Sequence, residues 1–208
     1  MRHSIALATT AMDCAPELRL ASLEVMFQAV ERVRERLMRS TSALEGAHLN
    51  HAVIGANAVA YWVGLKDEGS IRNTPNVDIL LDREDWNVAR PALERVGFVF
   101  ATPIFRPAVF LDGADGKVRQ AVRLWFAGDT LSLTSEPLPP VTDALLVRPY
   151  RIVTLSRLIR MKLSAWRTID RVHLQDMTRV GVLDSTWPER FPEPLAERLR
   201  EILADPDG

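Results

Sequence analysis

The sequence predicts an α/β (α+β) domain with a small mixed sheet flanked by helices, followed by a helical C-terminal region. Three observations indicate this class. Helical and strand periodicities alternate through residues 18–135, which is typical of a sheet covered by helices. Four prolines between residues 136 and 149 mark a connector. Residues 150–208 then carry only helical patterns, and we expect them to pack on the core.

Composition and charge exclude several classes of protein. The 208 residues suit one domain, and a hydrophobic share of 47% with a charged share of 25% is ordinary for a globular chain. The formal net charge of −1 favours neither nucleic acid nor an anionic membrane as a partner, although basic residues can still cluster locally. No apolar run approaches the ~20 residues that span a bilayer, so we expect no membrane association.

The first 17 residues read as a loosely ordered leader. Asp13 interrupts a mildly apolar stretch, which argues against a signal peptide. Cys14 is the only cysteine, so no disulfide can form within the chain. That usage fits a reducing compartment, and we expect a cytoplasmic protein.

Residues 16–37 are expected to form an amphipathic helix. Apolar residues recur at spacings of three and four, and charged residues fill the opposite face. Pro16 suits the first helical turn, where its missing N–H does no harm. We interpret this helix as a core-covering element and assign no chemistry to it. Its apolar stripe consists of Leu20, Leu23, Phe27, Val30, Val33 and Leu37.

A strand, a tight turn and a short helix are expected next, after a polar stretch. Residues 49–54 read as a buried strand, Gly55 as the turn, and residues 56–63 as an apolar helix. Residues 64–75 are polar and contain glycine and proline, which indicates a loop. Residues 76–81 then alternate as a second strand.

A helix is expected after this second strand. Asp82 is placed to cap it, with Asp85 three residues further on. Gly97 is a natural end signal. Pro91 lies inside the segment and should bend or shorten the helix.

Strand patterns return at Phe98. Residues 108–111 and 118–126 flank a turn rich in aspartate and glycine, which indicates a hairpin. Three C-terminal helices are then expected, over residues 155–166, 170–180 and 195–203.

The first predicted strand is followed by Gly55, Ala56 and Asn57, and the second carries Asn76 and Asp78. This segment and a later helical one resemble the nucleotidyltransferase superfamily, especially small bacterial members related to abortive-infection toxins. In those proteins a strand leads through small residues into a helix, and a second strand carries two carboxylates one residue apart, often after an Arg-x-Thr pattern. Residues 154–177, with their Lys-Leu-x-Ala core and Asp-rich continuation, are similar to the helical part of the same proteins. The resemblance spans most of residues 25–184. The counterparts in the first segment are Gly55, Ala56 and Asn57 at the turn, Arg72 and Thr74 in the loop, and Asn76 and Asp78 on the strand.

The resemblance implies magnesium-dependent chemistry on a nucleoside triphosphate. Carboxylates at i and i+2 on a strand point to the same side and hold Mg²⁺. The ions bridge the triphosphate and activate the attacking hydroxyl, and a neighbouring strand supplies a third carboxylate. Small residues at the turn let backbone N–H groups approach the phosphates. The residues implied are Asp78, Lys162 and Asp170 for catalysis, Asp78 with Asn76 for the metal, and Gly55, Ala56, Asn57, Arg72, Thr74 and Lys162 for the nucleotide.

The chain departs from this pattern at three positions. Asn76 replaces the first carboxylate, and a neutral amide binds Mg²⁺ far more weakly. Ala56 replaces a second small turn residue and restricts positive φ. The third carboxylate is expected near Arg123, where a cation would oppose metal binding. A shifted register would align Asp129 there instead.

Each candidate residue also has a structural interpretation. Asp78 can be a strand-edge residue satisfied by local N–H groups. Arg72 can hold a phosphate or pair with Asp78, whereas Asn73 and Thr74 read as ordinary turn residues. Lys162 falls within the apolar stripe of its helix, which is costly without an anion. It can bind phosphate, pair with Asp78 or Asp170, or extend to solvent.

The polar residues of the C-terminal helices allow two interpretations as well. Asp170, His173 and Asp176 lie three apart and can reach a common metal, but a helix cap plus solvent-facing side chains is the favoured interpretation. The remaining histidines read as incidental. Four arginines near Lys162 can line an anion-binding cleft or form a solvated helix face. They are Arg157, Arg160, Arg167 and Arg171.

The sequence therefore favours a catalytically impaired nucleotidyltransferase-like protein that binds a nucleotide or another phosphate ligand. One alternative is an active, toxin-like, Mg²⁺-dependent nucleotidyltransferase that modifies a protein or tRNA hydroxyl. Another is a non-catalytic interaction or antitoxin-like module. The nucleotide, the acceptor and the oligomeric state are left open.

Overall fold

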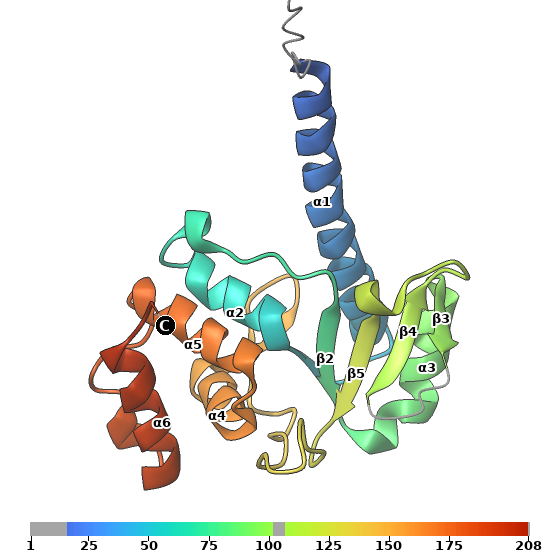
Figure 1. The fold of residues 1–208 in the computed structure, drawn as a ribbon. Helices are drawn as coiled ribbons and strands as arrows, with labels where there is room; N and C mark the ends of the chain where they lie inside the picture. Colours follow the sequence, from blue (N-terminus) through green and yellow to red (C-terminus); the bar gives the residue numbers. More distant parts are fainter. Residues whose placement is uncertain (1–15, 102–106, 208) are drawn as a thin grey trace, which may run out of the picture.

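A computed structural model describes residues 16–101 and 107–207 (Figure 1). Residues 1–15 of the expected leader, which include His3 and Cys14, lie outside the described residues. Among the described helices, none is both long enough and apolar enough to cross a membrane.

A seven-stranded mixed sheet forms the centre, in the order β3-β4-β5-β2-β1-β7-β6. β2 lies between antiparallel β1 and parallel β5. All residues of β1 and β2 are buried, because both faces of these central strands are covered. The strands are β1 (His51–Ile54), β2 (Val77–Leu81), β3 (Phe98–Ala101), β4 (Ala108–Asp112), β5 (Val122–Phe126), β6 (Ala144–Leu146) and β7 (Arg151–Val153).

The described residues form six α-helices, of which α1, α2 and α3 contact the sheet. α1 contacts α3 and the strands β1, β2 and β5, whereas α2 packs against α4 and α5. α4, α5 and α6 pack on one another and gather on one side of the molecule, beside α2 (Figure 1). The helices are α1 (Pro16–Gly46), α2 (Gly55–Gly64), α3 (Trp86–Arg95), α4 (Leu155–Ala165), α5 (Thr168–Arg179) and α6 (Glu193–Ala204).

The first helix differs from the sequence prediction in length and in burial. α1 continues to Gly46 instead of ending at residue 37, since Ser40, Thr41 and Leu44 are buried on its body-facing side. Its N-terminal part projects from the body (Figure 1). Leu37 is 8% exposed but Phe27 is 73% exposed, so only the C-terminal half of the apolar stripe covers the core.

Other differences from the predicted elements are local. The helix expected after Asp82 begins with a 3-10 turn at Arg83–Asp85, and neither Asp82 nor Asp85 makes a side-chain cap bond. α3 starts at Trp86 and runs through Pro91 to Arg95. The strand expected over residues 118–126 is shorter, because Val118–Gln120 form a 3-10 turn before β5.

Two strands lie where the sequence predicted none. β6 lies in the region interpreted as a proline-rich connector, and β7 lies at the start of residues 150–208, so the expectation of only helices there is wrong. β6 and β7 form an antiparallel pair, and β7 joins the edge of β1 through a parallel contact between Val53 and Ile152. β6 and β7 were not predicted because three residues are too few to show the alternation of apolar and polar side chains that indicates a strand. The three C-terminal helices, by contrast, confirm the predicted positions within two residues.

A buried arginine, Arg36, joins α1 to the segments that precede β2 and β5. The Arg36 side chain is 3% exposed, and its Nη1 donates to the carbonyl oxygens of Pro75 (2.5 Å) and Gln120 (2.9 Å). Its Nε lies 3.1 Å from an Asp112 carboxylate oxygen. These contacts fix the ends of the segments that lead into β2 and β5.

Replacing Arg36 with alanine should therefore destabilise the fold. The change leaves two carbonyl groups and one carboxylate without their buried partner, so we expect a loss of about 2–4 kcal/mol in the free energy of unfolding. Urea denaturation measures it. Arg32→Ala is the matched control on the same helix, since Arg32 is exposed, and should stay within about 0.5 kcal/mol of wild type. Equal losses in both variants would contradict a fastening role for Arg36.

Candidate active site

The turn between β1 and α2 brings a helix N-terminus against β2. Gly55 follows β1 directly and has a φ of +67°. A Cβ atom at this position would lie 2.6 Å from the Oδ2 of Asp78. Both constraints require glycine. No side chain caps α2 among the described residues, so its first N–H groups and its positive dipole end face the same region as Asp78.

Asp78 is a buried carboxylate whose two oxygens accept four hydrogen bonds. Arg123 donates through Nε to Oδ1 (2.6 Å) and through Nη2 to Oδ2 (2.7 Å). Trp125 Nε1 donates to Oδ1 (2.9 Å), and Asn76 Nδ2 donates to Oδ2 (3.0 Å). Asp78 is 6% exposed. The interpretation as a strand residue satisfied by neighbours fits this geometry, with side chains in place of backbone N–H groups as donors.

Arg123 lies directly beside Asp78 across the parallel pair of β2 and β5. The unshifted register, which puts a cation where the third carboxylate is expected, therefore matches the strand pairing. Asp129 lies beyond the end of β5 and pairs with Arg83 Nη2 at 2.5 Å. It is not among the described residues that line the cleft beside Asp78.

Short hydrogen bonds continue from Asp78 into the loop before β2. Thr74 Oγ1 donates to Asn76 Oδ1 (3.2 Å), and the Asn57 side chain donates to the Asn76 carbonyl oxygen (2.8 Å). The predicted residues Asn57, Thr74, Asn76 and Asp78 are thus brought together. In this arrangement they hold one another in place.

The junction of α4 and α5 places Lys162 opposite Asp170. Trp166 ends α4 in the left-handed conformation (φ 51°), which is unusual for a bulky residue and lets the chain reverse at once into α5. Lys162 Nζ lies 3.0 Å from Asp170 Oδ1. Arg167 donates to Asp170 through Nε (2.7 Å) and through its backbone N–H (3.2 Å), so Asp170 also caps α5.

Charges at this junction reflect burial and pairing. Burial lowers the pKa of the Lys162 ammonium, and the neighbouring Asp170 opposes the shift. Burial alone would raise the pKa of Asp170, but hydrogen bonds and charge from Arg167 and Lys162 hold it below its usual value. The pairing of Lys162 with Asp170 agrees with one of the predicted alternatives. The alternative in which Lys162 extends to solvent is wrong, because this residue is only 4% exposed.

Arg72 pairs with Asp176 on α5, so the expected alternative pairing with Asp78 is wrong. Its Nε and Nη2 lie 2.9 and 3.1 Å from the two Asp176 oxygens. Arg179 also contacts Asp176. Burial would raise the pKa of Asp176, but Arg72 and Arg179 lower it. The pair joins the loop before β2 to the helical region.

His173 lies between these two ion pairs on α5 and is 4% exposed. Its Nδ1 is buried with no hydrogen-bond partner among the described residues. Burial, reinforced by the charge of Lys162, lowers the pKa of His173 to about 4. The imidazole is therefore neutral near pH 7. The favoured interpretation is confirmed in one part, since Asp170 caps α5, and wrong in the other, since Asp170, His173 and Asp176 are buried and do not face solvent.

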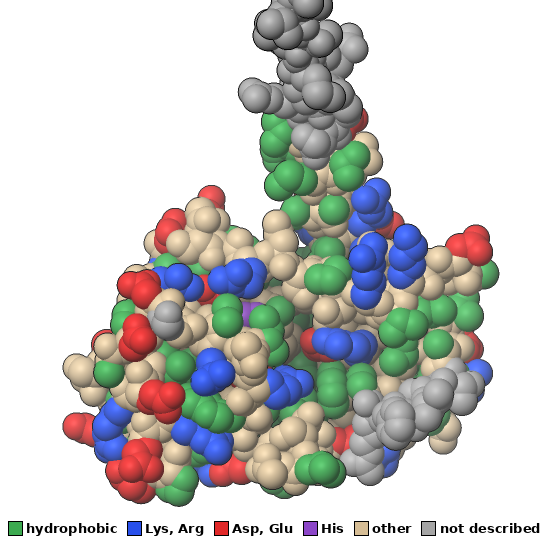
Figure 2. Space-filling model, in the orientation of Figure 1, with side chains coloured by type: hydrophobic (Ala, Val, Ile, Leu, Met, Phe, Trp, Pro, Cys, Tyr) green, Lys and Arg blue, Asp and Glu red, His purple; other side chains and the backbone are tan. Residues whose placement is uncertain are grey.

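The residues described above surround a cleft of about 360 Å³. Of the described residues that line it, four are cationic and two are carboxylates. Figure 2 shows a hollow on this face, with acidic and basic side chains on its walls. The cleft therefore presents an excess of positive charge beside an open helix N-terminus. The four cationic residues are Arg72, Arg123, Lys162 and Arg167.

The expected cluster of arginines around Lys162 contributes only Arg167 to the cleft. Arg157 pairs with Asp143 (2.6 Å) and Arg160 with Glu136 (2.7 Å) on another side of α4. The guanidinium of Arg171 lies over the Trp166 ring at 5.9 Å. These three side chains therefore make their contacts outside the cleft.

The donor set does not fit Mg²⁺. Both oxygens of Asp78 are engaged by protein donors, Asn76 turns its amide N–H₂ toward Asp78, and the guanidinium of Arg123 already neutralises the carboxylate. Across residues 16–101 and 107–207, no three His, Cys, Asp or Glu side chains are placed to hold a metal ion. The metal position implied for Asp78 and Asn76 therefore lacks the carboxylates that Mg²⁺ requires.

Two members of the site were missed from the sequence. Trp125 lies two residues after Arg123 on β5, so strand alternation puts both on one face, and this was the signal that Trp125 would also face Asp78. Arg179 carried no comparable signal, because an arginine in the last turn of a helix is common and its pairing with Asp176 three residues earlier does not reveal that Asp176 is buried.

Comparison with known proteins supports the fold. No protein-family model matches the chain, and no curated protein matches it significantly. A crystal structure of a candidate nucleotidyltransferase from H. pylori aligns with a TM-score of 0.50 at 18% identity, covering 86% of this chain and 78% of its own. JHP933 from Helicobacter pylori aligns with 0.49 at 19%, covering 86% and 76%. The antibiotic-resistance factor ANT(2'')-Ia aligns with 0.46 at 13%, covering 85% and 91%. The first likeness shows a nucleotidyltransferase-like fold.

Gly55→Ala should distinguish the close approach to Asp78 from ordinary turn strain. The added Cβ meets Asp78 Oδ2 in addition to the cost of positive φ, and we expect a loss of about 2–4 kcal/mol in the free energy of unfolding. Gly113→Ala is the matched control, with φ +78° and no atom within 4 Å of the added Cβ. It should lose only about 1 kcal/mol. Similar losses for the two variants in urea denaturation would show that the Asp78 side chain moves aside without a measurable cost in stability.

The low pKa of His173 should make the free energy of unfolding decrease as the pH is lowered. The unfolded state binds a proton below about pH 6.5, whereas folded His173 stays neutral to about pH 4. Its contribution is thus complete above pH 6.5 and declines as pH falls toward 4. Between pH 7.5 and 5 we expect wild type to lose about 2 kcal/mol more than His173→Gln.

Urea denaturation at the two pH values checks this expectation. His48→Gln is the control, because His48 is exposed and should keep the wild-type slope. If His173→Gln shows the same dependence on pH as wild type, His173 is not the group that titrates.

Proposed function

We propose that the protein binds a nucleotide or another phosphate ligand in the cleft and has lost two-metal nucleotidyl transfer. The observation that carries the proposal is the bidentate pair of Arg123 with Asp78. In the chemistry that the fold implies, a divalent ion on this carboxylate lowers the pKa of the attacking hydroxyl. A guanidinium attracts phosphate oxygens but has no vacant coordination position for a hydroxyl.

The arrangement of the ion pairs supports phosphate binding. Arg72 and Arg167 are 51% and 43% exposed at the side chain, and each can turn toward a ligand. The carboxylate that each would leave keeps a second cation: Lys162 for Asp170, and Arg179 for Asp176. No buried carboxylate is then stranded, which is the usual cost of breaking such a pair.

The α2 N-terminus supplies the rest of the anion site. Gly55 and Ala56 line the cleft, where the first N–H groups of α2 are free of side-chain caps. Helix N-termini favour phosphate through N–H donors and the dipole. Asn57 and Thr74 act through Asn76 as positioning residues for this wall.

The active alternative, an Mg²⁺-dependent transferase with a protein or tRNA acceptor, is not favoured, since the donor set offers one carboxylate already bound by arginine. A cleft without room for a ligand would favour the antitoxin-like alternative, whereas about 360 Å³ is open. Both remain distinguishable by the experiment that follows.

Isothermal titration with ATP, GTP, CTP, UTP and pyrophosphate, each in EDTA and in Mg²⁺, tests the proposal. We expect at least one to bind in EDTA, and Arg72→Gln and Arg167→Gln each to weaken it about tenfold, or ~1.4 kcal/mol. Arg157→Gln, a paired arginine outside the cleft, should bind as wild type. Binding that requires Mg²⁺ would support the active alternative, and no binding at all would favour the interaction module.

The double variant Asn76→Asp/Arg123→Asp gives this experiment a second arm. It rebuilds three neighbouring carboxylates, so we expect a lowered melting temperature in EDTA that Mg²⁺ or Mn²⁺ restores. Wild type should show no such metal effect. A metal-dependent rise in wild type would contradict the loss of the metal site.

A further inference from the structure

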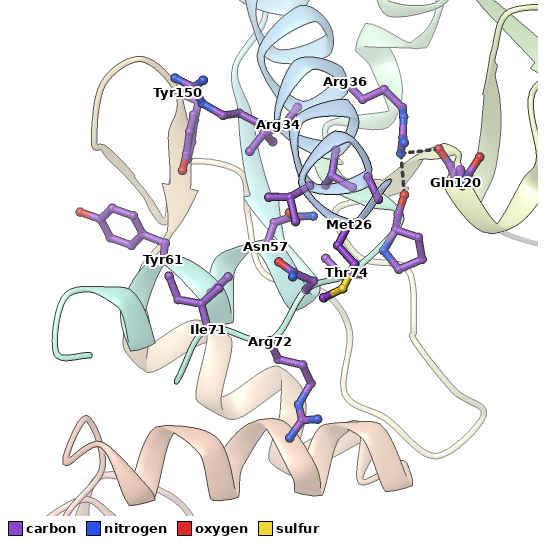
Figure 3. A pocket seen from close by; sticks show the side chains of 17 residues that line it. Met26, Arg34, Arg36, Asn57, Tyr61, Ile71, Arg72, Thr74, Gln120 and Tyr150 are labelled. Atoms are coloured by element: carbon purple, nitrogen blue, oxygen red, sulfur yellow. Dashed lines mark hydrogen bonds between the residues drawn. The ribbon is translucent and has the colours of Figure 1, made fainter. Parts of the chain in front are cut away.

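A second and larger cavity lies outside the cleft. It has a volume of about 510 Å³ and lies between α1, α2 and residues 71–75, with Gln120 and Tyr150 at its edges. Figure 3 shows Tyr61 and Tyr150 on one side of it and Gln120 on the other. Most of its lining residues do not line the cleft, although residues 72–75 line both spaces. We call this second cavity the α1 pocket.

The lining of the α1 pocket suits an apolar body of small-molecule size. α1 contributes Met26, Val30 and Val33, and the opposite wall contains Ala60 and Ile71. Cavities of 300–1,000 Å³ with mostly apolar walls and a few polar groups are typical of small-molecule sites. The two tyrosine rings add flat surfaces for a ring system.

The exposed half of the α1 stripe accounts for the apolar character of this wall. Met26 is 63% and Val30 39% exposed, although both continue the line of the buried Leu37 and Leu44. The described residues cover the C-terminal half of the stripe and leave these two side chains facing the pocket. A bound apolar body would therefore remove from water the surface that the fold leaves exposed.

The charges of the α1 pocket favour an anion. Of the described residues that line it, Arg34, Arg36 and Arg72 are cationic and none is a carboxylate. The Arg36 side chain already donates to the carbonyl oxygens of Pro75 and Gln120 and pairs with the Asp112 carboxylate. Arg34 is 73% exposed, and its partner Glu31 lies 3.4 Å away on the surface. Such exposed pairs contribute little, so Arg34 is available to an anionic group.

Arg72 links the α1 pocket to the cleft. It lines both cavities, and Figure 3 shows its side chain pointing away from the α1 pocket toward a neighbouring helix. There it reaches Asp176 of α5. Residues 72–75 therefore form a wall between the two cavities, and a shift of this wall moves a cation of the cleft.

We infer that the α1 pocket is a second binding site, for a small amphiphilic anion with a ring-containing apolar body and one acidic group held by Arg34. Occupancy of this site positions residues 72–75 and changes the affinity of the cleft. The coupling, but not the binding, rests on the proposed phosphate site.

Titration with the fluorescent probe 8-anilinonaphthalene-1-sulfonate tests the site, because the probe carries one sulfonate on an aromatic body. We expect saturable binding of one probe per chain to the fully folded protein. Ala29→Trp should abolish it by filling the pocket, since Ala29 is an exposed residue of the α1 wall. Val25→Trp, on the same helix and 59% exposed but outside the lining, should bind as wild type.

The acidic group is tested separately with the uncharged probe N-phenyl-1-naphthylamine. Arg34→Gln should weaken the sulfonate probe about two- to fivefold, the range of a surface ion pair, and leave the uncharged probe unchanged. Equal effects on both probes would overturn the preference for an anion.

Pyrophosphate then distinguishes failure of the pocket from failure of the cleft. With the pocket occupied by the sulfonate probe, the Kd for pyrophosphate should change at least threefold, and the Kd for the probe should change by the same factor in the reciprocal experiment. If pyrophosphate binds nowhere, probe binding and its loss in Ala29→Trp still stand. Non-saturable probe binding, or a dimer that Ala29→Trp dissociates, would overturn the inference and assign the surface to another copy of the chain.

Discussion

The cleft is organised by the need to neutralise three buried carboxylates. A carboxylate left unpaired away from water costs several kcal/mol, far more than any single surface contact returns. Each of the three is met by an arginine from a different part of the chain, so the ion pairs connect sheet, loop and helices around one space. The pairs are Asp78 with Arg123, Asp170 with Arg167, and Asp176 with Arg72.

Elements with many residues of regular pattern could be predicted from the sequence, and elements defined by their neighbours could not. The α4–α6 helices and β2 follow from periodicity alone. β6 and β7 are three residues long and lie near prolines, so they become strands only because they pair with each other and because β7 pairs with β1. α1 extends past residue 37 because its later turns meet the sheet, which local propensity does not encode.

In the candidate site, too, contacts set by local pattern could be predicted, and contacts set by the packing of distant segments could not. The position of Arg123 beside Asp78 follows from strand register and was predicted. The partner of Arg72 was not, because the choice between Asp78 and Asp176 depends on how α5 lies against the loop. The burial of Asp170 and Asp176 was missed for a related reason. Polar residues three apart on a helix predict a face exposed to solvent, unless cationic side chains from other segments cover that face.

The bidentate pair at the centre of the sheet also limits how this chain can change over generations. Losing Arg123 alone leaves Asp78 buried beside neutral Trp125 and Asn76, and losing Asp78 alone leaves a guanidinium without its anion. Gaining an acid at position 76 alone crowds a second negative charge against the first. Each single substitution is expected to give a less stable protein, so the effects of substitutions at positions 76, 78 and 123 depend on one another. A change of this arrangement into a metal-binding set of carboxylates therefore requires concerted substitutions.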